Sequence, residues 1–282
     1  MEEGVRIAGN YADAEIIQLP NGQYRMYYAI EPEVPNNQLE VFSSISEDGL
    51  HWEKEPGTRL TFATFPDVIQ LPSGKYRIYF QRFSQDYNTQ AIHSAISNDG
   101  LRFELEEGVR LLPGASGLDR DNIASTSVIR LADGRYRMYY RGAVNERTDP
   151  MNPNPFTTRL FSAISEDGLQ FEKEEGIRID TRNEILHEMS DGTFILPMDD
   201  GTYRLYFASV DGVYQADSED GLNFELKEES VFTGSFRLGA GPSSAGPPGD
   251  PTIIQMEDGY RMYFGQHTLG IYSAFLSASE KD

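Results

Sequence analysis

The sequence predicts an all-β fold, a five-bladed β-propeller with four-stranded antiparallel blades. A strand–turn–strand segment recurs five times in the 282 residues, each time around a turn glycine. Four copies continue into a second hairpin with the pattern Ser-x-Asp-Gly. The last copy lacks the outer segment of the others, whereas the chain begins with a segment of that type, MEEGVRI. Long repeats with four strands each are typical of propellers.

The five copies define the blades in order. We expect them at residues 11–60, 61–112, 120–180, 188–232, and 248–282 together with 1–9. They form one domain, because a single blade cannot bury both faces of its sheet without neighbours. Asn-Gly, Ser-Gly and Asp-Gly pairs at the hairpins tolerate the positive φ angles of tight turns. The N-terminal strand is expected to complete the last blade and close the ring.

Residues that recur in every blade are predicted to be structural. The second strand of each copy carries a Tyr-Arg pair, with the arginines at Arg25, Arg77, Arg137, Arg204 and Arg261. A single active site has no use for five equivalent arginines, so we expect packing or ion pairing. The Ser-x-Asp-Gly turns are similar to the Asp-box of sialidases, which is structural there, and the same role is predicted here.

Composition excludes several classes of protein. The chain has no cysteine, which excludes disulfides, and a net charge of −21 argues against nucleic-acid or anionic-membrane partners. The sequence contains no run of about 18 apolar residues, which is the length that a membrane-spanning helix needs. The acidic start has no signal-peptide pattern. We expect a cytoplasmic protein if this N-terminus is native and a secreted one if a leader was removed. The acidic rim favours a monomer.

The first strands of the blades differ where they enter the central channel, and there the sequence places carboxylates. Asp13 and Glu15, Asp67, Asp191 and Asp250 come from four blades, and Ser125 stands in the third. Because inner strands converge on the axis, these groups should lie close together. Crowded carboxylates repel, so one pKa should rise while another stays low. Such a pair suits glycosidic cleavage. Alternatively, these residues only terminate strands.

Two arginines interrupt the repeat on the same face. Arg82 and Arg141 follow the second strands of blades two and three, where long connections begin. A pair of guanidinium groups over an acidic channel would suit a carboxylate or phosphate on a substrate. Equally, the two groups could neutralise the acidic cluster.

These residues give the chain a resemblance to the five-bladed β-propeller glycosidases, which include arabinanases, β-xylosidases, arabinofuranosidases and, more distantly, invertases. Asp13-Ala14 stands where that family has Asp-Pro, and Phe65–Val68 looks like its Ala-Pro-Asp-Val. Asp191-Gly192-Thr193 stands where it has Glu before Gly/Ala-Pro. The resemblance implies that Asp13 is the base or nucleophile and Asp191 the acid, while Asp67 binds the sugar or tunes a neighbour.

The chain departs from the family pattern at two further positions, and it offers a further candidate acid. Ser125 replaces an Asp that tunes the acid, and Asp121 lies a few residues upstream as a substitute. Asp250 replaces a histidine linked to a bound cation, and His267 follows at the far end of the next strand. Glu188, just before blade four, is an alternative proton donor.

Three hypotheses follow for the function. The first is a glycoside hydrolase for a small or terminal sugar, which requires no cofactor. The second is a carbohydrate-binding propeller without catalysis. The third is a calcium-dependent hydrolase. Oxygen ligands would come from Asp13, Asp67, Asp191 and Asp250, and Asp250 is the one that we assign as a metal ligand.

Overall fold

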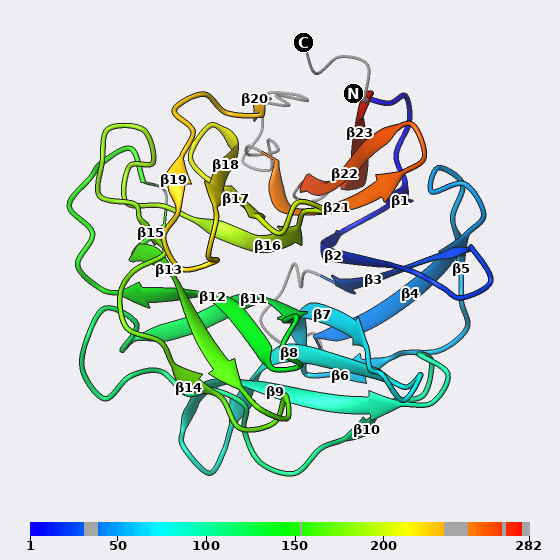
Figure 1. Cartoon of the computed structure of the whole chain (residues 1–282), viewed down its shortest axis with the longest axis horizontal. Helices are drawn as coiled ribbons and strands as arrows, with labels where there is room; N and C mark the ends of the chain where they lie inside the picture. The colour runs from blue at the N-terminus through cyan, green and yellow to red at the C-terminus, as the bar shows by residue number, and fades with distance from the viewer. Residues whose placement is uncertain (31–38, 153, 234–247, 267–268, 278–282) are drawn as a thin grey trace.

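The computed structural model describes residues 1–30, 39–152, 154–233, 248–266 and 269–277, and shows five antiparallel sheets arranged around a central axis (Figure 1). This confirms the predicted five-bladed β-propeller. The described residues form strands and turns without an α-helix, so none of them belongs to a helix that could cross a membrane.

The first four blades run from the innermost strand outward. Blade 1 contains β2 (Tyr11–Gln18), β3 (Tyr24–Ile30), β4 (Glu40–Ser46), β5 (Glu53–Lys54) and β6 (Leu60–Thr61). Blade 2 contains β7 (Thr64–Gln70), β8 (Tyr76–Ser84), β9 (Thr89–Ser97) and β10 (Glu104–Leu105). Blade 3 contains β11 (Asn122–Arg130), β12 (Tyr136–Val144), β13 (Thr157–Ser165), β14 (Glu172–Lys173) and β15 (Ile179–Asp180). Blade 4 contains β16 (Asp191–Pro197), β17 (Tyr203–Ala208), β18 (Gly212–Ser218), β19 (Glu225–Leu226) and β20 (Phe232–Thr233).

The fifth blade joins the two ends of the chain. It contains β21 (Gly249–Met256), β22 (Gly259–Gln266) and β23 (Gly270–Ser277), and its outer strand is β1 (Ile7–Ala8). β1 pairs antiparallel with β23, with Ile7 opposite Ile271. The predicted closure of the ring by the N-terminal strand is therefore confirmed.

The cores lie between the blades, because each second strand sends alternate side chains to its two neighbours. In β3, Met26 and Tyr28 pack with residues of blade 5, whereas Tyr27 packs with Val68 and Ile78 of blade 2. Fully burying a side chain of this kind contributes about 1.5–3 kcal/mol. Stability thus depends on every blade having both neighbours.

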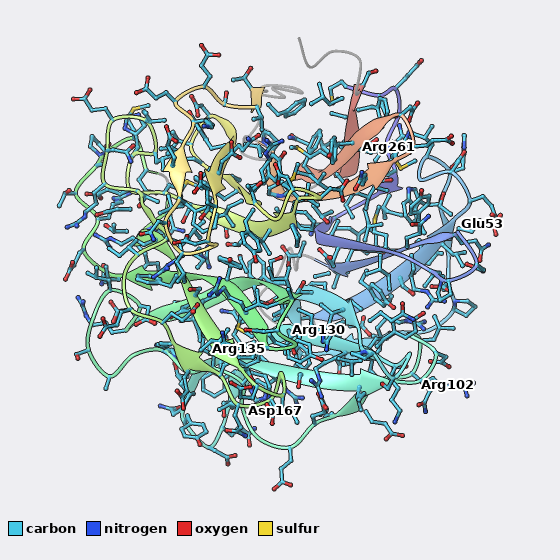
Figure 2. The ribbon with its side chains drawn as sticks, in the orientation of Figure 1. Glu53, Arg102, Arg130, Arg135, Asp167 and Arg261 are labelled. Carbon is cyan, nitrogen blue, oxygen red and sulfur yellow. The ribbon has the colours of Figure 1, made fainter. Side chains whose placement is uncertain are left out.

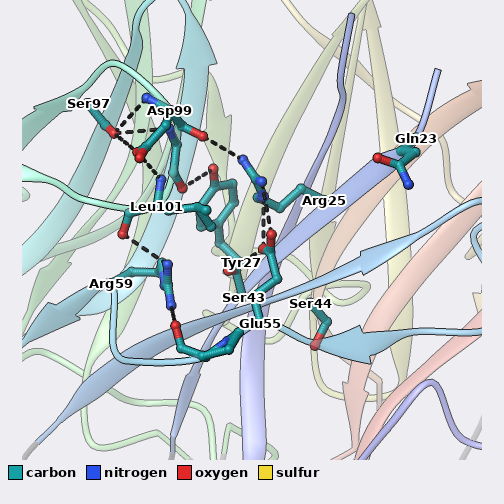
Figure 3. Close-up of polar contacts among 12 residues, drawn as sticks. Gln23, Arg25, Tyr27, Ser43, Ser44, Glu55, Arg59, Ser97, Asp99 and Leu101 are labelled. Atoms are coloured by element: carbon teal, nitrogen blue, oxygen red, sulfur yellow. Dashed lines mark hydrogen bonds and ion pairs between the residues drawn. The ribbon is translucent and has the colours of Figure 1, made fainter. Parts of the chain in front are cut away.

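The recurring arginines fasten adjacent blades. Arg25 pairs with Glu55 at 2.9 Å and donates to the Asp99 carbonyl of blade 2 at 2.9 Å (Figure 3). Beside it, the Tyr27 hydroxyl donates to the Gly100 carbonyl at 2.9 Å. The same contacts recur with Arg77 and Tyr79, Arg137 and Tyr139, and Arg261 and Tyr263. The predicted ion-pairing role is confirmed.

The Ser-x-Asp-Gly turns are held by their own side chains, as predicted. The Ser97 hydroxyl accepts from the Gly100 N–H at 2.9 Å, and Asp99 Oδ1 accepts from Leu101 and Arg102 N–H groups. These hydrogen bonds lower the pKa of Asp99 to about 2. The turns therefore shape the scaffold, while charged side chains such as Glu53 and Arg102 lie exposed at the rim (Figure 2).

Candidate functional site

All five innermost strands are irregular at the same level of the channel. Each shows a register shift against its second strand, between Ala12 and Glu15 in blade 1 for example. One residue in each shift has φ between 49° and 58°, namely Asp13, Phe65, Ser125, Gly192 and Asp250. Such backbone is uncommon for residues other than glycine and is frequent near functional sites. The shift turns these five residues toward one another.

These irregular segments surround a narrow pocket on the axis with a volume of about 30 Å³. Its walls are formed by Asp13, Ala14, Glu15, Phe65, Pro66, Ser125, Thr126, Gly192, Thr193, Asp250 and Pro251. The volume is enough for about two water molecules. The pocket can therefore admit a polar group of a larger ligand, the rest of which would lie at its mouth.

Asp13 is the carboxylate that the fold constrains most directly at this level. Its residue is only 8% exposed, and its φ of 54° is set by the shift in β2. The Phe65 N–H of the next blade donates to Asp13 Oδ2 at 3.0 Å. Asp13 is therefore held in the pocket from a neighbouring strand, as a catalytic carboxylate needs to be.

Asp191 lies beside the pocket at the start of β16. Arg141 Nη1 donates to Asp191 Oδ1 at 2.7 Å, and the Ser125 hydroxyl donates to the same oxygen at 3.1 Å. The Arg141 guanidinium carbon also lies 5.8 Å from the centre of the Phe65 ring. The Asp191 side chain keeps 30% of its surface exposed, so a ligand can reach it.

Glu15 and Asp67 form a second carboxyl pair, two residues further along their strands. Burial raises the pKa of Glu15 well above its usual value, and the Asp67 charge raises it further. Burial also raises the pKa of Asp67, although its Oδ2 accepts from the Val128 N–H at 2.9 Å. Thr252 donates to Glu15 Oε2 at 3.2 Å. Both groups therefore hold protons more tightly than free carboxyl groups do.

Blades 4 and 5 approach each other closely at the pocket. A Cβ on Gly192 would lie 2.2 Å from the Asp250 Cα and 2.6 Å from its backbone nitrogen. With φ at 58°, this position admits only glycine. Gly192 thus brings Asp250 to the axis, where its residue contributes to the pocket wall.

Arg82 is not the counterpart of Arg141, contrary to the predicted pair. In blade 3, Arg141 lies opposite Ala124, whereas the equivalent Thr64 of blade 2 lies opposite Gln81. Arg82 is one residue further on, so its side chain leaves the opposite face of the strand. The sequence suggests a pair because each arginine stands at the start of a long connection. Arg141 contacts the axial carboxylate of Asp191.

Glu188 lies in a network that binds its carboxylate on several sides. Thr148 donates through its hydroxyl at 2.5 Å and its N–H at 2.7 Å, and Asp149 N–H and the Thr157 hydroxyl add two more contacts. Although burial acts in the opposite direction, these hydrogen bonds lower the pKa of Glu188 to about 2. Glu188 therefore fastens the connection after β12, and its role as an alternative proton donor stays a prediction.

Two further predicted residues lie away from the pocket or outside the described residues. Asp121 is exposed, and its Oδ2 accepts from the Asn145 N–H at 2.7 Å, which ties together the outer ends of β11 and β12. His267 lies outside the described residues. Their roles in substrate binding stay predictions.

The donor set does not favour a metal. Within the described parts of the chain, no three His, Asp or Glu side chains come close enough together to hold an ion. The predicted calcium ligand Asp250 shares the pocket with Asp13 and Glu15, and calcium binding there stays a prediction.

Comparison with known proteins supports the fold directly. A thermostable family-43 glycoside hydrolase superposes with a TM-score of 0.75 at 13% identity, covering 97% of this chain and 93% of its own. The endo-arabinase from Bacteroides thetaiotaomicron VPI-5482 gives 0.72 at 14% identity, with 99% of both chains covered. The chain has the fold of the five-bladed propeller glycoside hydrolases.

A third structure broadens the group. It comes from the GH130 family of mannoside phosphorylases, which contains glycoside hydrolases that target β-1,2 mannosidic linkages in Candida mannan. It superposes with a TM-score of 0.73 at 15% identity and covers 97% of this chain and 86% of its own. Neither protein-family models nor curated proteins give a match to the sequence.

Sequence reasoning found the axial carboxylates but missed how they are connected. The Arg141–Asp191 contact and its link to Ser125 cross from blade 3 to blade 4. The only sign of this contact in the sequence is that Arg141 interrupts the repeat, and this does not indicate which carboxylate the arginine binds. The raised pKa of Glu15 follows first from its burial and then from the charge of Asp67 beside it.

Proposed function

We propose that the protein is a glycoside hydrolase that cleaves a small or terminal sugar at the mouth of the axial pocket. The observation that carries the proposal is the shared backbone irregularity, which brings Asp13 into the pocket and Asp191 to its edge through Ser125. The likeness of fold to glycoside hydrolases supports it. At these identities the likeness extends to the fold alone, so the site carries the functional argument.

The residues divide the chemistry between them. Asp13 activates a water molecule or attacks the anomeric carbon, and Asp191 supplies the proton for the departing oxygen. Glu15 and Asp67 keep their protons to higher pH, which limits the negative charge that accumulates beneath Asp13. Arg141 holds the Asp191 side chain in place.

A specific contact favours a second candidate, carbohydrate binding without cleavage. Asp191 is engaged by the Arg141 guanidinium, and Ser125 stands beside it where a second carboxylate would be expected from the resemblance. A carboxylate in a charge-assisted hydrogen bond is a good acceptor for sugar hydroxyls. In this alternative the same pocket orients a sugar and leaves its linkage intact.

A panel of aryl glycosides separates the two candidates. Release of the aryl group at a rate well above the blank, for at least one sugar, supports the hydrolase. Saturable thermal stabilisation by a sugar without any turnover supports the binding protein instead. A parallel series with a chelator tests the calcium hypothesis, since loss of turnover or stability there would restore a metal to the site.

A further inference from the structure

Two connections at the pocket end of blades 3 and 4 are fastened to each other immediately before Asp191. Residues 145–156 link β12 to β13, and residues 181–190 link β15 to β16, which begins with Asp191. The Glu188 carboxylate joins the two connections, because it accepts from the N–H group of Thr148 at 2.7 Å and from its hydroxyl at 2.5 Å. Together they form one wall beside the residue proposed to donate the proton.

The backbone of the second connection is strained at two successive residues. His187 has a φ of 49° and Glu188 a φ of 63°, which is uncommon for residues other than glycine. Such backbone persists only where the surroundings enforce it, and it is concentrated at active sites and ligand clamps. Here the Glu188 N–H donates to the Thr181 carbonyl at 2.8 Å, and the Glu188 carbonyl accepts from the Thr158 N–H at 3.0 Å. These contacts fix the direction in which His187 leaves the chain.

His187 is paired with Asp149 across the two connections. Its Nδ1 lies 2.9 Å from Asp149 Oδ2. The Met151 N–H and the His187 ring hold the pKa of Asp149 below its usual value, and an ionised carboxylate only accepts hydrogen bonds. The proton of the neutral imidazole is therefore on Nδ1, and Nε2 presents a lone pair. Within the described chain no residue bonds Nε2, and the His187 side chain keeps 27% of its surface exposed.

A second pair of this kind lies at the other end of the blades and differs in its setting. His51 Nδ1 lies 2.7 Å from Asp48 Oδ2, but His51 belongs to a Ser-x-Asp-Gly turn and its side chain is 88% exposed. The equivalent residues of the next three blades are Arg102, Gln170 and Asn223. That position therefore accepts any polar residue, whereas His187 stands outside the repeat on strained backbone.

His187 lies on the side of the pocket from which the leaving group departs. It precedes Asp191 by four positions, which limits the distance between the two Cα atoms to about 14 Å. Thr158, which holds the Glu188 carbonyl, is paired with Ala143, two residues beyond the Arg141 that contacts Asp191. Since Asp191 is proposed to protonate the departing oxygen, the group attached to that oxygen extends toward this wall.

We propose that His187 binds the leaving group of the substrate by accepting, at Nε2, a hydrogen bond from a sugar hydroxyl. Asp149 is the positioning residue that orients the ring. This assignment rests on the proposed hydrolase function and narrows its substrates to glycosides whose departing part is itself a sugar. An aryl leaving group has no hydroxyl to offer, so the two kinds of substrate distinguish the role.

Two conservative variants separate the ring nitrogens of His187. In His187→Asn the side-chain amide takes the place of Nδ1 and nothing replaces Nε2, and asparagine tolerates the positive φ. In His187→Gln the longer amide reaches the place of Nε2 and still accepts from a hydroxyl. The measurement is kcat/KM for disaccharides and for an aryl glycoside with the same terminal sugar. His187→Asn should lower the ratio of disaccharide to aryl glycoside at least tenfold, and His187→Gln should return it to within threefold of wild type.

His51→Asn is the matched control, and its ratio should stay within twofold of wild type. Asp149→Asn should lower the ratio as well, because an amide can donate to Nδ1 and the proton then moves to Nε2. Nitrogen-15 NMR of the imidazole rings detects this change of tautomer, which a merely structural role would not produce. An unchanged ratio in a folded His187→Asn protein, or equal changes in His187→Asn and His51→Asn, would overturn the proposal.

A titration distinguishes failure of this proposal from failure of the hydrolase function. If no glycoside is cleaved, the hydrolase is contradicted, and disaccharides are added to the wild-type protein while the imidazole NMR signals are recorded. A bound disaccharide should shift the Nε2 signal of His187 and leave that of His51 in place. Saturable binding without a shift at His187 would contradict its role, whereas absence of binding by any sugar would end both proposals.

Discussion

Glu15 and Asp67 differ from the acidic residues of the rim because their carboxyl groups are withdrawn from bulk water. Asp67 is only 3% exposed. Two effects raise the pKa of its neighbour Glu15, namely burial and the charge of Asp67. If both ionised, two charges would be added beneath Asp13. Retained protons at this level limit the negative charge of the pocket.

This arrangement predicts a pH-dependent effect of Glu15→Gln on stability. An unfolded glutamate has a pKa of about 4.3, and the folded value is higher, so the folded state binds more protons between the two. Wild-type stability therefore falls as pH rises through this window. Glutamine removes that loss and can still accept from Thr252.

We expect the Tm of Glu15→Gln to match wild type near pH 3.5 and to exceed it increasingly as the pH rises above about 4.3. Each kcal/mol regained should raise Tm by about 2–4 °C. Thermal unfolding followed by circular dichroism across this range is the measurement. A gain largest at low pH would show that Glu15 is favourably ionised in the fold.

Sequence reasoning could predict which carboxylates face the axis but not their protonation or partners. Asp13 and Asp250 were visible because they depart from the repeat at equivalent positions. The Arg141–Asp191 contact depends on strand register across two blades. Arg82 lies one position further along its strand than the residue equivalent to Arg141, and its side chain therefore leaves the opposite face. The sequence alone does not show this difference of one residue.

At the level of elements, the second strand of each blade and the outer hairpin of the next form one unit of stability. Tyr79 of β8 donates to the Gly168 carbonyl at 2.9 Å, and its ring packs against Phe171. Arg77 adds a contact to the Asp167 carbonyl at 3.0 Å. Removing one such contact leaves a buried carbonyl without its donor.

Tyr79→Phe should therefore destabilise the protein by about 1 kcal/mol, as expected for one buried hydrogen bond. The matched control is Tyr206→Phe, because Tyr206 has no turn of blade 5 to bind among the described residues, and its effect should be close to zero. Urea unfolding of both variants measures the difference. Equal destabilisation by the two substitutions would mean that the turn carbonyl is not the reason for the recurring tyrosine.

The strands were predictable from alternation and turn glycines, whereas the irregularity of the inner strands was not. Its five residues are Asp13, Phe65, Ser125, Gly192 and Asp250, and they share no side-chain type. The positive φ angle arises because five strands converge at one level. Only Gly192 carries a local reason for it, since a Cβ there would overlap Asp250.

For the whole molecule, the divided fifth blade leads to a design. Glu2 and Glu174 make the same contacts, because the N–H of each donates to a serine carbonyl and its carboxylate accepts from the hydroxyl of the same serine. In this superposition of blades 5 and 3, Phe275 of β23 lies where Ile164 lies, and Met1 lies where Lys173 lies. A linker with the sequence of residues 165–172, SEDGLQFE, should thus join Phe275 to Met1 in register. New termini can be opened between Ser116 and Gly117, which are both exposed.

This circular permutant is expected to fold and to have a Tm several degrees above the same permutant with alanine in place of the linker phenylalanine. The gain comes from packing the linker phenylalanine against Tyr206, Ile253 and Met262, since burying one aromatic side chain contributes about 1.5–3 kcal/mol. Differential scanning calorimetry gives the comparison. No difference between the two linkers would mean that these side chains do not accept the ring.

Ring closure and blade number were readable from the sequence because the repeat is regular and its last copy is divided. The function was less readable, because it depends on the few residues at which the blades differ. Those residues acquire meaning only when the five strands meet at the axis, and the axial pocket is therefore where the account can be tested.

The most direct test compares kcat/KM of wild type and Asp13→Asn on the aryl glycoside that the wild type cleaves best. The account predicts a loss of at least about 100-fold, since a positioned acid or base contributes about 10²–10⁴-fold. Asp86→Asn, at an exposed carboxylate in the connection after β8, is the control and should stay within threefold of wild type. Retention of activity in Asp13→Asn, or equal losses in both variants, would contradict a catalytic site in the axial pocket.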